Sequence, residues 1–431
     1  MDLFEQFMRG FPKLEDFSRI EVGLSGGLDS VVLLHLLARA ARQHRFDLRA
    51  VHVHHGLSEN ADIWAGFCQN LCSRLNIPLR VVRIQIEQDG SGIEAAARKQ
   101  RYRVFADGLS DIVALAHHQD DQAETFLLAA VRGGGLRGLA AMPVWRNLNS
   151  QTRIWRPLLE FGRCDLAAYA EEQGLDYVED ESNADNRFLR NWFRNEVLPH
   201  WQLRIPSVQR HILANIRSLQ QDLALLDQVI EADYQDICSD GFFDIAKWRA
   251  SDDLRRRHVL LHFLRSHDVT APQAVVHEME RVLLQAEQGE WRLPQADIYA
   301  YRNRLRLLPK GWEHRLPWTE KPLKGRLQTI LQTAGFVLKP HPNGLSEAAL
   351  HQQGMIRTFH TGDHIAQAYG SKTVGKILQE AHVLPAVRRH WPVLADVSGQ
   401  HCLAVANFRT DCNQSAEEGW WPVYEPFQAF Y

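Results

Sequence analysis

The alternation of short β-type runs with longer helical segments in the first 133 residues is the strongest constraint on the fold. The β-type runs are rich in Val, Ile and Leu, and the segments between them have helical composition. Expected strands lie at 19–24, 48–55, 79–86 and 111–118, and expected helices at 31–43, 63–76, 93–109 and 121–133. Strands separated by helices form right-handed βαβ units, so we expect an α/β fold with a doubly wound, mainly parallel sheet.

Polar segments follow three of the expected strands, at 25–30, 52–55 and 117–121. The carboxyl ends of parallel strands meet at one edge of a sheet, where α/β folds bind their ligands. We therefore expect these three segments to converge on one site.

The chain beyond about residue 205 has a different pattern. The β signal fades there and apolar residues recur at helical spacing, and short β-like stretches return from about residue 327. A Trp-, Pro- and Gly-rich stretch at 311–325 is typical of a linker. We expect three domains, which are an α/β domain at 1–215, a helical domain at 216–315 and a small mixed α+β domain at 327–431.

Composition excludes several classes of protein. Hydrophobic residues make up 45% of the chain and charged residues 23%, which is typical of folded globular protein. The six cysteines show no Cys-x-x-Cys spacing and fit a reducing compartment. No apolar run is long enough for a membrane span, and the first residues lack the pattern of a secretory signal. We therefore expect a cytoplasmic protein that does not enter a membrane.

The sharpest motif is Ser-Gly-Gly-Leu-Asp-Ser at 25–30, between an expected strand and an expected helix. Two adjacent glycines let the backbone turn tightly and approach a ligand, and the following helix start presents N–H groups to an anion. Asp29 would repel a bare phosphate, so its presence predicts a divalent cation between carboxylate and phosphate. The motif is neither a Walker P-loop nor a dinucleotide loop. A capped Gly-Gly turn is the alternative without function.

A second polar motif, Ala-His-His-Gln-Asp-Asp-Gln-Ala-Glu-Thr at 116–125, runs from an expected strand end into a helix. So many charged groups make poor core, because burying a charge without a partner is costly. Asp121 and Glu124 share one helix face. Such a pair can hold Mg²⁺, or bind an amine and accept its proton; a solvated acidic helix start is the alternative. The histidines at 52, 54, 55, 117 and 118 lack the spacing of a zinc site, so we favour packing and substrate contacts for them.

Arginines dominate two further segments. The glycine-rich stretch 132–139 carries Arg132 and Arg137, and a plain surface loop is its alternative. The segment 179–195 changes from acidic to basic, and its arginines at 187, 190 and 194 recur at helical spacing with aromatic residues between them. Such a face can contact phosphates and stack bases, while a solvated basic helix explains the arginines equally well.

The loop at 25–30 resembles the pyrophosphate-binding loop of the N-type ATP pyrophosphatases, which cleave ATP between the α and β phosphates. Within that superfamily the order and spacing of the motifs resemble the tRNA(Ile)-lysidine synthetase family. The matching motifs are SGGLDS at 25–30, HVHHGLS at 52–58, EAAARKQRY at 94–102, AHHQDDQAET at 116–125, RGGGLRGLAAM at 132–142, RPLL at 156–159 and EDESNADNRFLRNWFRN at 179–195. His54 and Ser58 depart from the family pattern, in which Asn and Arg are usual. Weaker similarity continues to the segment VLPAVRRHWPVL at 383–394.

The resemblance implies an ATP-dependent ligase that forms a carbon–nitrogen bond on tRNA. ATP and Mg²⁺ would adenylate the wobble cytidine of an isoleucine tRNA with a CAU anticodon, at C2. Free L-lysine would then displace AMP to give lysidine, so that the codon read changes from AUG to AUA. The three expected domains would be an ATP pyrophosphatase catalytic domain, a helical tRNA-binding domain and a C-terminal tRNA-recognition domain.

The resemblance also implies roles for individual residues. Asp29 would hold Mg²⁺, and Arg98 and Arg190 would contact phosphate or adenylate. Asp121 and Glu124 would position and deprotonate the lysine. ATP would be bound by Ser25, Gly26, Gly27, Leu28, Asp29 and Ser30, and tRNA by Arg132, Arg137, Arg187, Arg194, Arg357, Lys372, Lys376, Arg388 and Arg389.

The formal net charge of −3 argues against indiscriminate, salt-driven binding of nucleic acid, but it averages over unlike parts. Residues 321–393 hold nine basic and three acidic side chains, and 187–217 is also basic, so both stretches can contact tRNA phosphates. Two other functions stay open, an ATP-dependent tRNA thiolase of the same superfamily and a non-catalytic tRNA-binding protein. The sequence leaves the choice between a monomer and a homodimer open.

Overall fold

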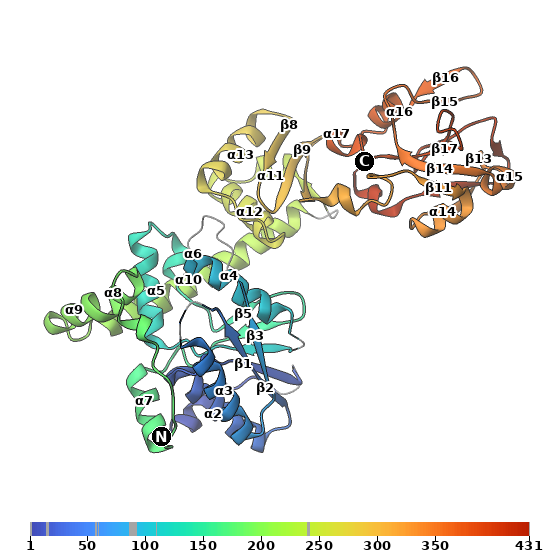
Figure 1. Ribbon diagram of the computed structural model, residues 1–431. Coiled ribbons are helices and arrows are strands. Elements are labelled where there is room, and N and C mark those ends of the chain that lie inside the picture. The colour runs from blue at the N-terminus through green and yellow to red at the C-terminus, as the bar shows by residue number, and fades with distance from the viewer. Residues whose placement is uncertain are drawn as a thin grey trace. The chain divides into compact units, whose positions relative to one another are not determined.

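The computed structural model describes residues 2–13, 17–56, 58, 60–85, 93–108, 110–238 and 242–430 (Figure 1). Contacts divide the chain into two compact units, Met1–Gln228 and Val229–Tyr431. This division does not separate 216–315 from 327–431, so the three-domain scheme stays a prediction.

The first unit is built on a six-stranded sheet with the strand order β3-β2-β1-β4-β6-β5. All neighbouring pairs are parallel except β5 and β6 at one edge. The strands are β1 (Arg19–Gly23), β2 (Asp47–His54), β3 (Leu79–Arg83), β4 (Ile112–Ala114), β5 (Trp145–Asn147) and β6 (Arg153–Trp155). The expected doubly wound, mainly parallel sheet is confirmed.

Helices cover both faces of this sheet. Alternate residues of the strands point to opposite faces, so that Ile112 and Ala114 pack with α2 while Val113 packs with α4. The helices of this unit are α1 (Leu3–Arg9), α2 (Leu28–Gln43), α3 (Ala61–Leu75), α4 (Ile93–Ala106), α5 (Gln119–Val131), α6 (Leu136–Leu139), α7 (Arg163–Glu172), α8 (Leu189–Trp192), α9 (Leu198–Arg204) and α10 (Val208–Ile237). The boundary between the two units falls within the long helix α10. A π-helical turn, η3 (Phe193–Val197), joins α8 to α9, and a 3₁₀ turn, η2, spans Glu181–Ala184.

The strand order places the site. The chain steps from β1 outward to β2 and β3 and then returns to the other side of β1 with β4. At such a switch point the loops after the two central strands diverge and leave a crevice at the carboxyl edge of the sheet. The loop after β1 contains residues 25–27 and the segment after β4 contains residues 116–118, so two of the sequence motifs border this crevice.

The second unit begins with helices and an antiparallel sheet. The helices α11 (Ile245–Ala250), α12 (Asp253–Ser266) and α13 (Gln273–Gln285) fit the expected helical region. The same region also contains a sheet in the order β7-β10-β9-β8, from β7 (Phe243–Asp244), β8 (Gln288–Arg292), β9 (Ala296–Tyr301) and β10 (Arg304–Pro309). Sequence analysis missed these strands, although alternate residues of β9 are buried as a period of two requires.

The rest of the second unit is the expected small α+β region. It contains β11 (Leu323–Arg326), β12 (Val337–His341), β13 (Gly344–Leu345), β14 (Gln353–Thr358), β15 (His364–Ala366), β16 (Ser371–Thr373), β17 (Pro392–Asp396), β18 (Cys402–Val405), β19 (Arg409–Thr410), β20 (Ser415–Ala416) and β21 (Gly419–Val423), with α14 (Leu327–Thr333), α15 (Glu347–His351), α16 (Val374–Glu380), α17 (Pro385–Arg388) and the 3₁₀ turns η4 (Trp312–Arg315) and η5 (Glu425–Phe430). Antiparallel pairing joins these strands into sheets of five, four and two strands.

The predicted linker at 311–325 is part of the core of this unit. Trp318 is 1% exposed, and its indole N–H donates to the carbonyl oxygen of His390 at 3.0 Å. Leu316 is buried in the same cluster. The linker prediction was wrong because Leu316 and Trp318 fill the core instead of spacing two domains.

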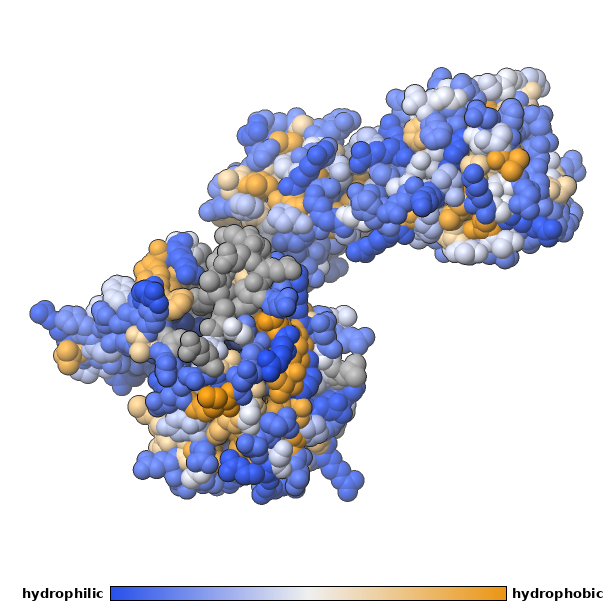
Figure 2. Space-filling view, in the orientation of Figure 1, coloured by the Kyte–Doolittle hydropathy of each residue, from blue (hydrophilic) through white to orange (hydrophobic). Residues whose placement is uncertain are grey.

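The surface facing the viewer in Figure 2 is mainly hydrophilic, with scattered hydrophobic patches. None of the helices among the residues that the structure describes combines the length and the apolar character needed to cross a membrane.

Candidate active site

The hydroxyl of Ser30 fixes the shape of the loop after β1. Ser30 Oγ accepts hydrogen bonds from the backbone N–H groups of Ser25 and Gly26, both at 3.2 Å, and donates to the carbonyl oxygen of Gly27 at 2.9 Å. Gly26 has a φ of +92°, and a Cβ there would lie 3.0 Å from Cγ2 of Val178. Both the backbone angle and the close approach require glycine at this position.

Helix α2 begins at the end of this loop. Its N-cap residue, Gly27, supplies no side-chain cap, and Leu28 is buried in the core at the start of the helix. The first-turn N–H groups and the positive end of the helix dipole both favour an anion. The residues predicted to bind ATP thus form one continuous loop and helix start that is suited to phosphate.

Asp29 lies in the first turn of α2, and one of its two carboxylate oxygens is available to a ligand. Its Oδ1 atom is buried without a hydrogen-bond partner among the described residues, while Oδ2 lies 3.6 Å from Nε2 of His118. A buried carboxylate oxygen without a donor fits a hard cation such as Mg²⁺, which proteins commonly hold through one or two carboxylates together with substrate phosphates. Within the described part of the chain no group of three or more His, Cys, Asp or Glu side chains is placed to hold a metal on its own.

Asp121 and Glu124 meet two arginines at the start of α5. Glu124 is 0% exposed and accepts hydrogen bonds from Nε of Arg190 at 2.7 Å and from Nε of Arg194 at 2.6 Å. Asp121 Oδ1 accepts from Nη2 of Arg190 at 2.9 Å and from Nη2 of Arg194 at 3.3 Å. The structure therefore brings together Asp121, Glu124, Arg190 and Arg194.

The helix that carries these arginines is anchored by Phe193. Phe193 is buried with Leu198 and Ile212, in a cluster that also contains α5 residues. It opens the π-helical turn, and the four-residue spacing of Arg190 and Arg194 places both guanidinium groups toward α5. Of the aromatic residues that lie between the arginines, Phe193 is a core residue, so its ring does not stack on bases. Phe188 and Trp192 are exposed.

His118 connects the acidic cluster to the phosphate loop. The ring Nδ1 of His118 accepts a hydrogen bond from the backbone N–H of Asp120 at 3.2 Å, and the backbone N–H of His118 donates to Oδ2 of Asp121 at 3.0 Å. These two hydrogen bonds cap the start of α5. Burial acts to lower the pKa of His118, but the carboxylates of Asp29, Asp121 and Asp120 outweigh it and raise the pKa. His118 thus lies between two acids, Asp29 in the first turn of α2 and Asp121 in the first turn of α5.

Two other strand-end histidines, His117 and His55, have lowered pKa values. Burial lowers the pKa of His117 to about 3, and the cations of Arg156, Arg190 and Arg98 oppose its protonation further. Burial and Arg101 lower the pKa of His55 to about 4.

The end of β2 also reaches the site edge. His52 Nδ1 lies 2.9 Å from the carbonyl oxygen of Leu24, so this third predicted segment adjoins the loop after β1. The departures from the family pattern have local partners. His54 Nε2 lies 3.2 Å from Oδ1 of Asp62, and Ser58 Oγ accepts from the backbone N–H of Asn60 at 3.1 Å.

Two more arginines border the cluster. Arg98 lies on the exposed side of α4 over the ring of Tyr102, at 5.2 Å from its centroid. Arg156, just after β6, is buried and donates to the carbonyl oxygen of Pro143 at 2.9 Å, while its Nε is without a partner among the described residues. Sequence analysis assigned no role to Arg156, although RPLL at 156–159 follows a strand end and was available as a signal.

The residues predicted to bind tRNA lie in unlike places. Arg132 is exposed at the end of α5, and Lys376 and Arg389 are exposed in the second unit. Arg137 and Arg187 are exposed but ion-paired with Asp227 and Asp185, Lys372 pairs with Glu380, and half-buried Arg388 donates to Tyr301 Oη.

Arg357 does not have the placement that was predicted for it. Its side chain is 5% exposed and forms a bidentate ion pair with Asp363, with both distances 2.7 Å. It also donates to the carbonyl oxygen of Gly399. This buried guanidinium, which is bound to a carboxylate and to a loop carbonyl, holds loops together, so we correct its assignment from tRNA contact to structure. The assignment of Arg194 also changes from tRNA contact to structure, because its guanidinium is bound to Asp121 and Glu124.

The parallel sheet, the phosphate loop at its carboxyl edge and the adjoining acid–arginine cluster define a PP-loop ATP-utilising domain. A family model described as the PP-loop domain matches residues 3–201. Two more, described as the TilS substrate binding domain and the TilS substrate C-terminal domain, match residues 243–306 and 357–424.

Relatives over the full chain identify the family. The tRNA(Ile)-lysidine synthase of Neisseria meningitidis serogroup B is 46% identical over 98% of this chain and 99% of its own. That of Neisseria gonorrhoeae is 44% identical over 100% and 97%, and that of Chromobacterium violaceum 39% over 96% and 97%. The chain belongs to the tRNA(Ile)-lysidine synthase family, whose members are ATP-dependent, tRNA-modifying ligases.

Similarity to a solved structure is weaker. A U34-tRNA thiolase from Methanococcus maripaludis aligns with a TM-score of 0.41 and 18% identity over 50% of this chain and 78% of that chain. A score at this level carries no argument about function.

Proposed function

We propose that this chain joins free lysine to C2 of the wobble cytidine of an isoleucine tRNA with a CAU anticodon, at the expense of ATP. The C2 oxygen of the cytidine attacks the α phosphate of ATP, which forms an adenylated base and releases pyrophosphate. The ε-amine of lysine then attacks C2 and AMP leaves. The observation that carries this proposal is the link from Asp29 through His118 to Asp121, which sets a phosphate site beside an amine site.

In this proposal the loop at 25–30 and the start of α2 bind the β and γ phosphates of ATP. Asp29, with its unpartnered buried Oδ1, holds Mg²⁺. The bound cation would neutralise charge on the phosphates and the departing pyrophosphate. Ser30 Oγ already accepts from the backbone N–H groups of Ser25 and Gly26, so the shape of the loop is fixed before ATP arrives. The N–H groups of the first turn of α2, which have no partner within the helix, would then stabilise developing negative charge without reorganising.

The two acids take different roles. Glu124 is fully buried and its two oxygens are occupied by Arg190 and Arg194, so we assign it the task of positioning these arginines. Asp121 is the more exposed acid, with 12% of its side chain accessible, and we assign it the lysine ammonium and its proton. Arg190 uses two of its five N–H donors on the acids, so three remain for the adenylate phosphate.

The tRNA contacts are proposed for exposed cations and aromatic residues. Phe188 and Trp192 are exposed next to the arginine cluster and present ring faces to unstacked anticodon bases. Phosphate contacts are proposed for Arg132, Arg137, Arg187, Lys372, Lys376, Arg388 and Arg389, and an adenylate contact for Arg98.

The thiolase alternative gains no support from the cysteines. Cys68 and Cys72 are both buried, and burial raises their pKa values to about 12 and about 11. Thiols of this kind are not nucleophilic at neutral pH.

The test is a three-product assay. Purified protein, ATP, Mg²⁺, radiolabelled lysine and unmodified tRNA should give AMP, pyrophosphate and lysine-labelled tRNA in equal amounts. Asp29→Asn should abolish all three products, and Asp121→Asn should retain tRNA-dependent pyrophosphate release while lysine incorporation falls. Lysine incorporation by Asp29→Asn at the wild-type rate would contradict the loop assignment.

A further inference from the structure

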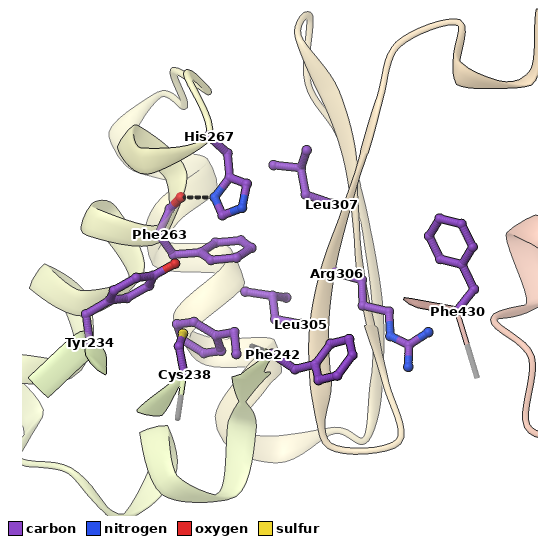
Figure 3. Close-up of a pocket in the computed structure, with 10 residues that line it drawn as sticks. Tyr234, Cys238, Phe242, Phe263, His267, Leu305, Arg306, Leu307 and Phe430 are labelled. Atoms are coloured by element: carbon purple, nitrogen blue, oxygen red, sulfur yellow. Dashed lines mark hydrogen bonds between the residues drawn. The ribbon is translucent and has the colours of Figure 1, made fainter. Parts of the chain in front are cut away.

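The second unit contains a cavity of about 390 Å³ that the proposed chemistry does not use (Figure 3). Its wall combines the end of α10, the end of α12, strand β10 and three aromatic residues from elsewhere in the unit. The lining residues are Tyr234, Cys238, Phe242, Phe243, Phe263, His267, Leu305, Arg306, Leu307 and Phe430. The volume is within the roughly 300–1,000 Å³ of small-molecule sites.

Arg306 is the lining residue that most clearly indicates a bound ligand. The residue is 9% exposed, and its Nε and Nη1 atoms are buried without a hydrogen-bond partner among the described residues. Burial, together with the nearby cation of Arg304, lowers the pKa of Arg306 to about 10. The side chain is still charged at neutral pH, and a buried charge without a partner is costly.

A second cation faces the same aromatic ring. The guanidinium carbon of Arg304 lies 4.3 Å from the ring centroid of Phe242, and that of Arg306 lies 5.8 Å from it. Neither arginine forms an ion pair with any acid in the described part of the chain, and no carboxylate lines the cavity. Figure 3 shows the Arg306 side chain directed between Phe242 and Phe430.

Another buried arginine of the same unit shows how a structural arginine differs. Arg357 is paired bidentately with Asp363 and bound to a backbone carbonyl. Arg306 has no such acid, although it is nearly as buried. The two guanidinium groups of Arg304 and Arg306 lie near the same ring without an acid between them. An anion from a ligand would neutralise them.

We propose that this cavity binds one unpaired nucleotide of the tRNA, with its phosphate between Arg304 and Arg306 and its base against Phe242. The inference rests on tRNA being the substrate. An aromatic face next to guanidinium groups suits a base and its phosphodiester. A phosphodiester carries one negative charge and needs no metal ion. It therefore fits a site with two arginines and no carboxylate better than a nucleoside triphosphate with Mg²⁺ does. The TilS substrate binding domain model, which covers 243–306, includes both arginines.

The first experiment separates binding from folding. Arg306→Met in the full chain removes the charge and keeps the length of the side chain. It should leave the melting temperature unchanged or raise it, because an unpaired buried charge is removed, while tRNA binding weakens about tenfold. The slope of log Kd against log salt should fall by about 0.7, the value for one phosphate contact on a single strand. Arg292→Met is the matched control, since Arg292 is an exposed cation of the same sheet that pairs with Glu290.

The second experiment tests the base contact and the source of the nucleotide. Phe242→Leu should weaken tRNA binding and Phe242→Trp should preserve it, because only the latter keeps a ring face. AMP should bind the full chain no differently in wild type and Arg306→Met.

Three results would overturn the inference. One is an unchanged KM for tRNA in Arg306→Met with lysine transfer intact, which leaves the proposed function standing. Another is loss of AMP binding in Arg306→Met with tRNA affinity unchanged, which assigns the cavity to a free nucleotide. The third is failure of wild type to modify tRNA, which removes the proposed function and this inference together.

Discussion

The Nε2 atom of His118 lies 3.6 Å from Oδ2 of Asp29, and the two residues belong to different loops at the carboxyl edge of the sheet. The same Nε2 atom lies 3.5 Å from Oδ2 of Asp121. The surrounding carboxylates raise the pKa of His118, and its ring lies between the loop at 25–30 and the acid–arginine cluster. Its position couples the placement of Asp29 to the start of α5.

Replacing His118 should separate its two roles. His118→Asn keeps a side-chain oxygen that can cap α5, because Asn is a good N-cap residue, but it removes the imidazole ring between Asp29 and Asp121. We expect near-wild-type stability and a KM for ATP raised about ten- to hundredfold, as for a lost charged hydrogen bond. His118→Ala should show the same kinetic defect and an additional loss of about 1 kcal/mol in the free energy of unfolding. A normal KM for ATP in both variants would show that the bridge is not functional.

The two acids of the site should respond differently to neutralisation. Glu124→Gln replaces the main acceptor of two partly buried guanidinium groups, a carboxylate, by a neutral amide, so the free energy of unfolding should fall by about 3 kcal/mol or more. Asp121→Asn keeps that acceptor and should cost less stability, while the KM for lysine rises at least tenfold. Denaturant unfolding and lysine titration of the same two preparations compare them. An equal loss of stability with no change in the KM for lysine would contradict the division of roles.

Much of the fold of the first unit follows from local sequence. The expected strands at 19–24, 48–55, 79–86 and 111–118 and the helices between them correspond to β1–β4 and α2–α5. They were predictable because each βαβ unit is built from consecutive segments. The strands β8–β10 were missed because they are short and lie among strong helical segments, and the linker at 311–325 was mistaken for a spacer because Trp318 reaches core residues that are distant in sequence.

The candidate site was predictable in position and less so in detail. Strand order sets the loops after β1 and β4 together, so Asp29 and Asp121 were expected to be close. Helical spacing relates Arg190 to Arg194 but does not say which way their common face points, and the burial of Phe193 decides that it points to Glu124. No local sequence pattern predicts the Arg357–Asp363 ion pair, because the pair depends on the fold of the sheet that carries Arg357.

The two glycines of the phosphate loop should differ in what they tolerate. Gly26→Ala forces a Cβ into a position with φ of +92° and 3.0 Å from Val178, so we expect a loss of about 1–3 kcal/mol in the free energy of unfolding. Gly27 has a negative φ, and a Cβ there meets its first neighbours at 3.6 and 3.8 Å, which is ordinary contact. Gly27→Ala should therefore fold normally and lose affinity for ATP if the loop holds phosphates. Normal ATP affinity in Gly27→Ala would count against backbone contact at this residue.

The stability of the protein should depend on pH through His55. Burial and Arg101 lower its pKa from 6.5 to about 4 in the folded protein, so between these values the unfolded chain binds more protons than the folded one. Stability contributed by the neutral ring is therefore present above pH 6.5 and is lost as the pH falls toward 4, by at most about 1.4 kcal/mol per pH unit. His55→Gln should flatten the fall in the free energy of unfolding between pH 6.5 and pH 5, measured by urea unfolding. His351→Gln, at an exposed histidine of the second unit, is the matched control and should leave the curve unchanged. Equal slopes in wild type and His55→Gln would show that the ring is protonated in the folded state or is accessible to water.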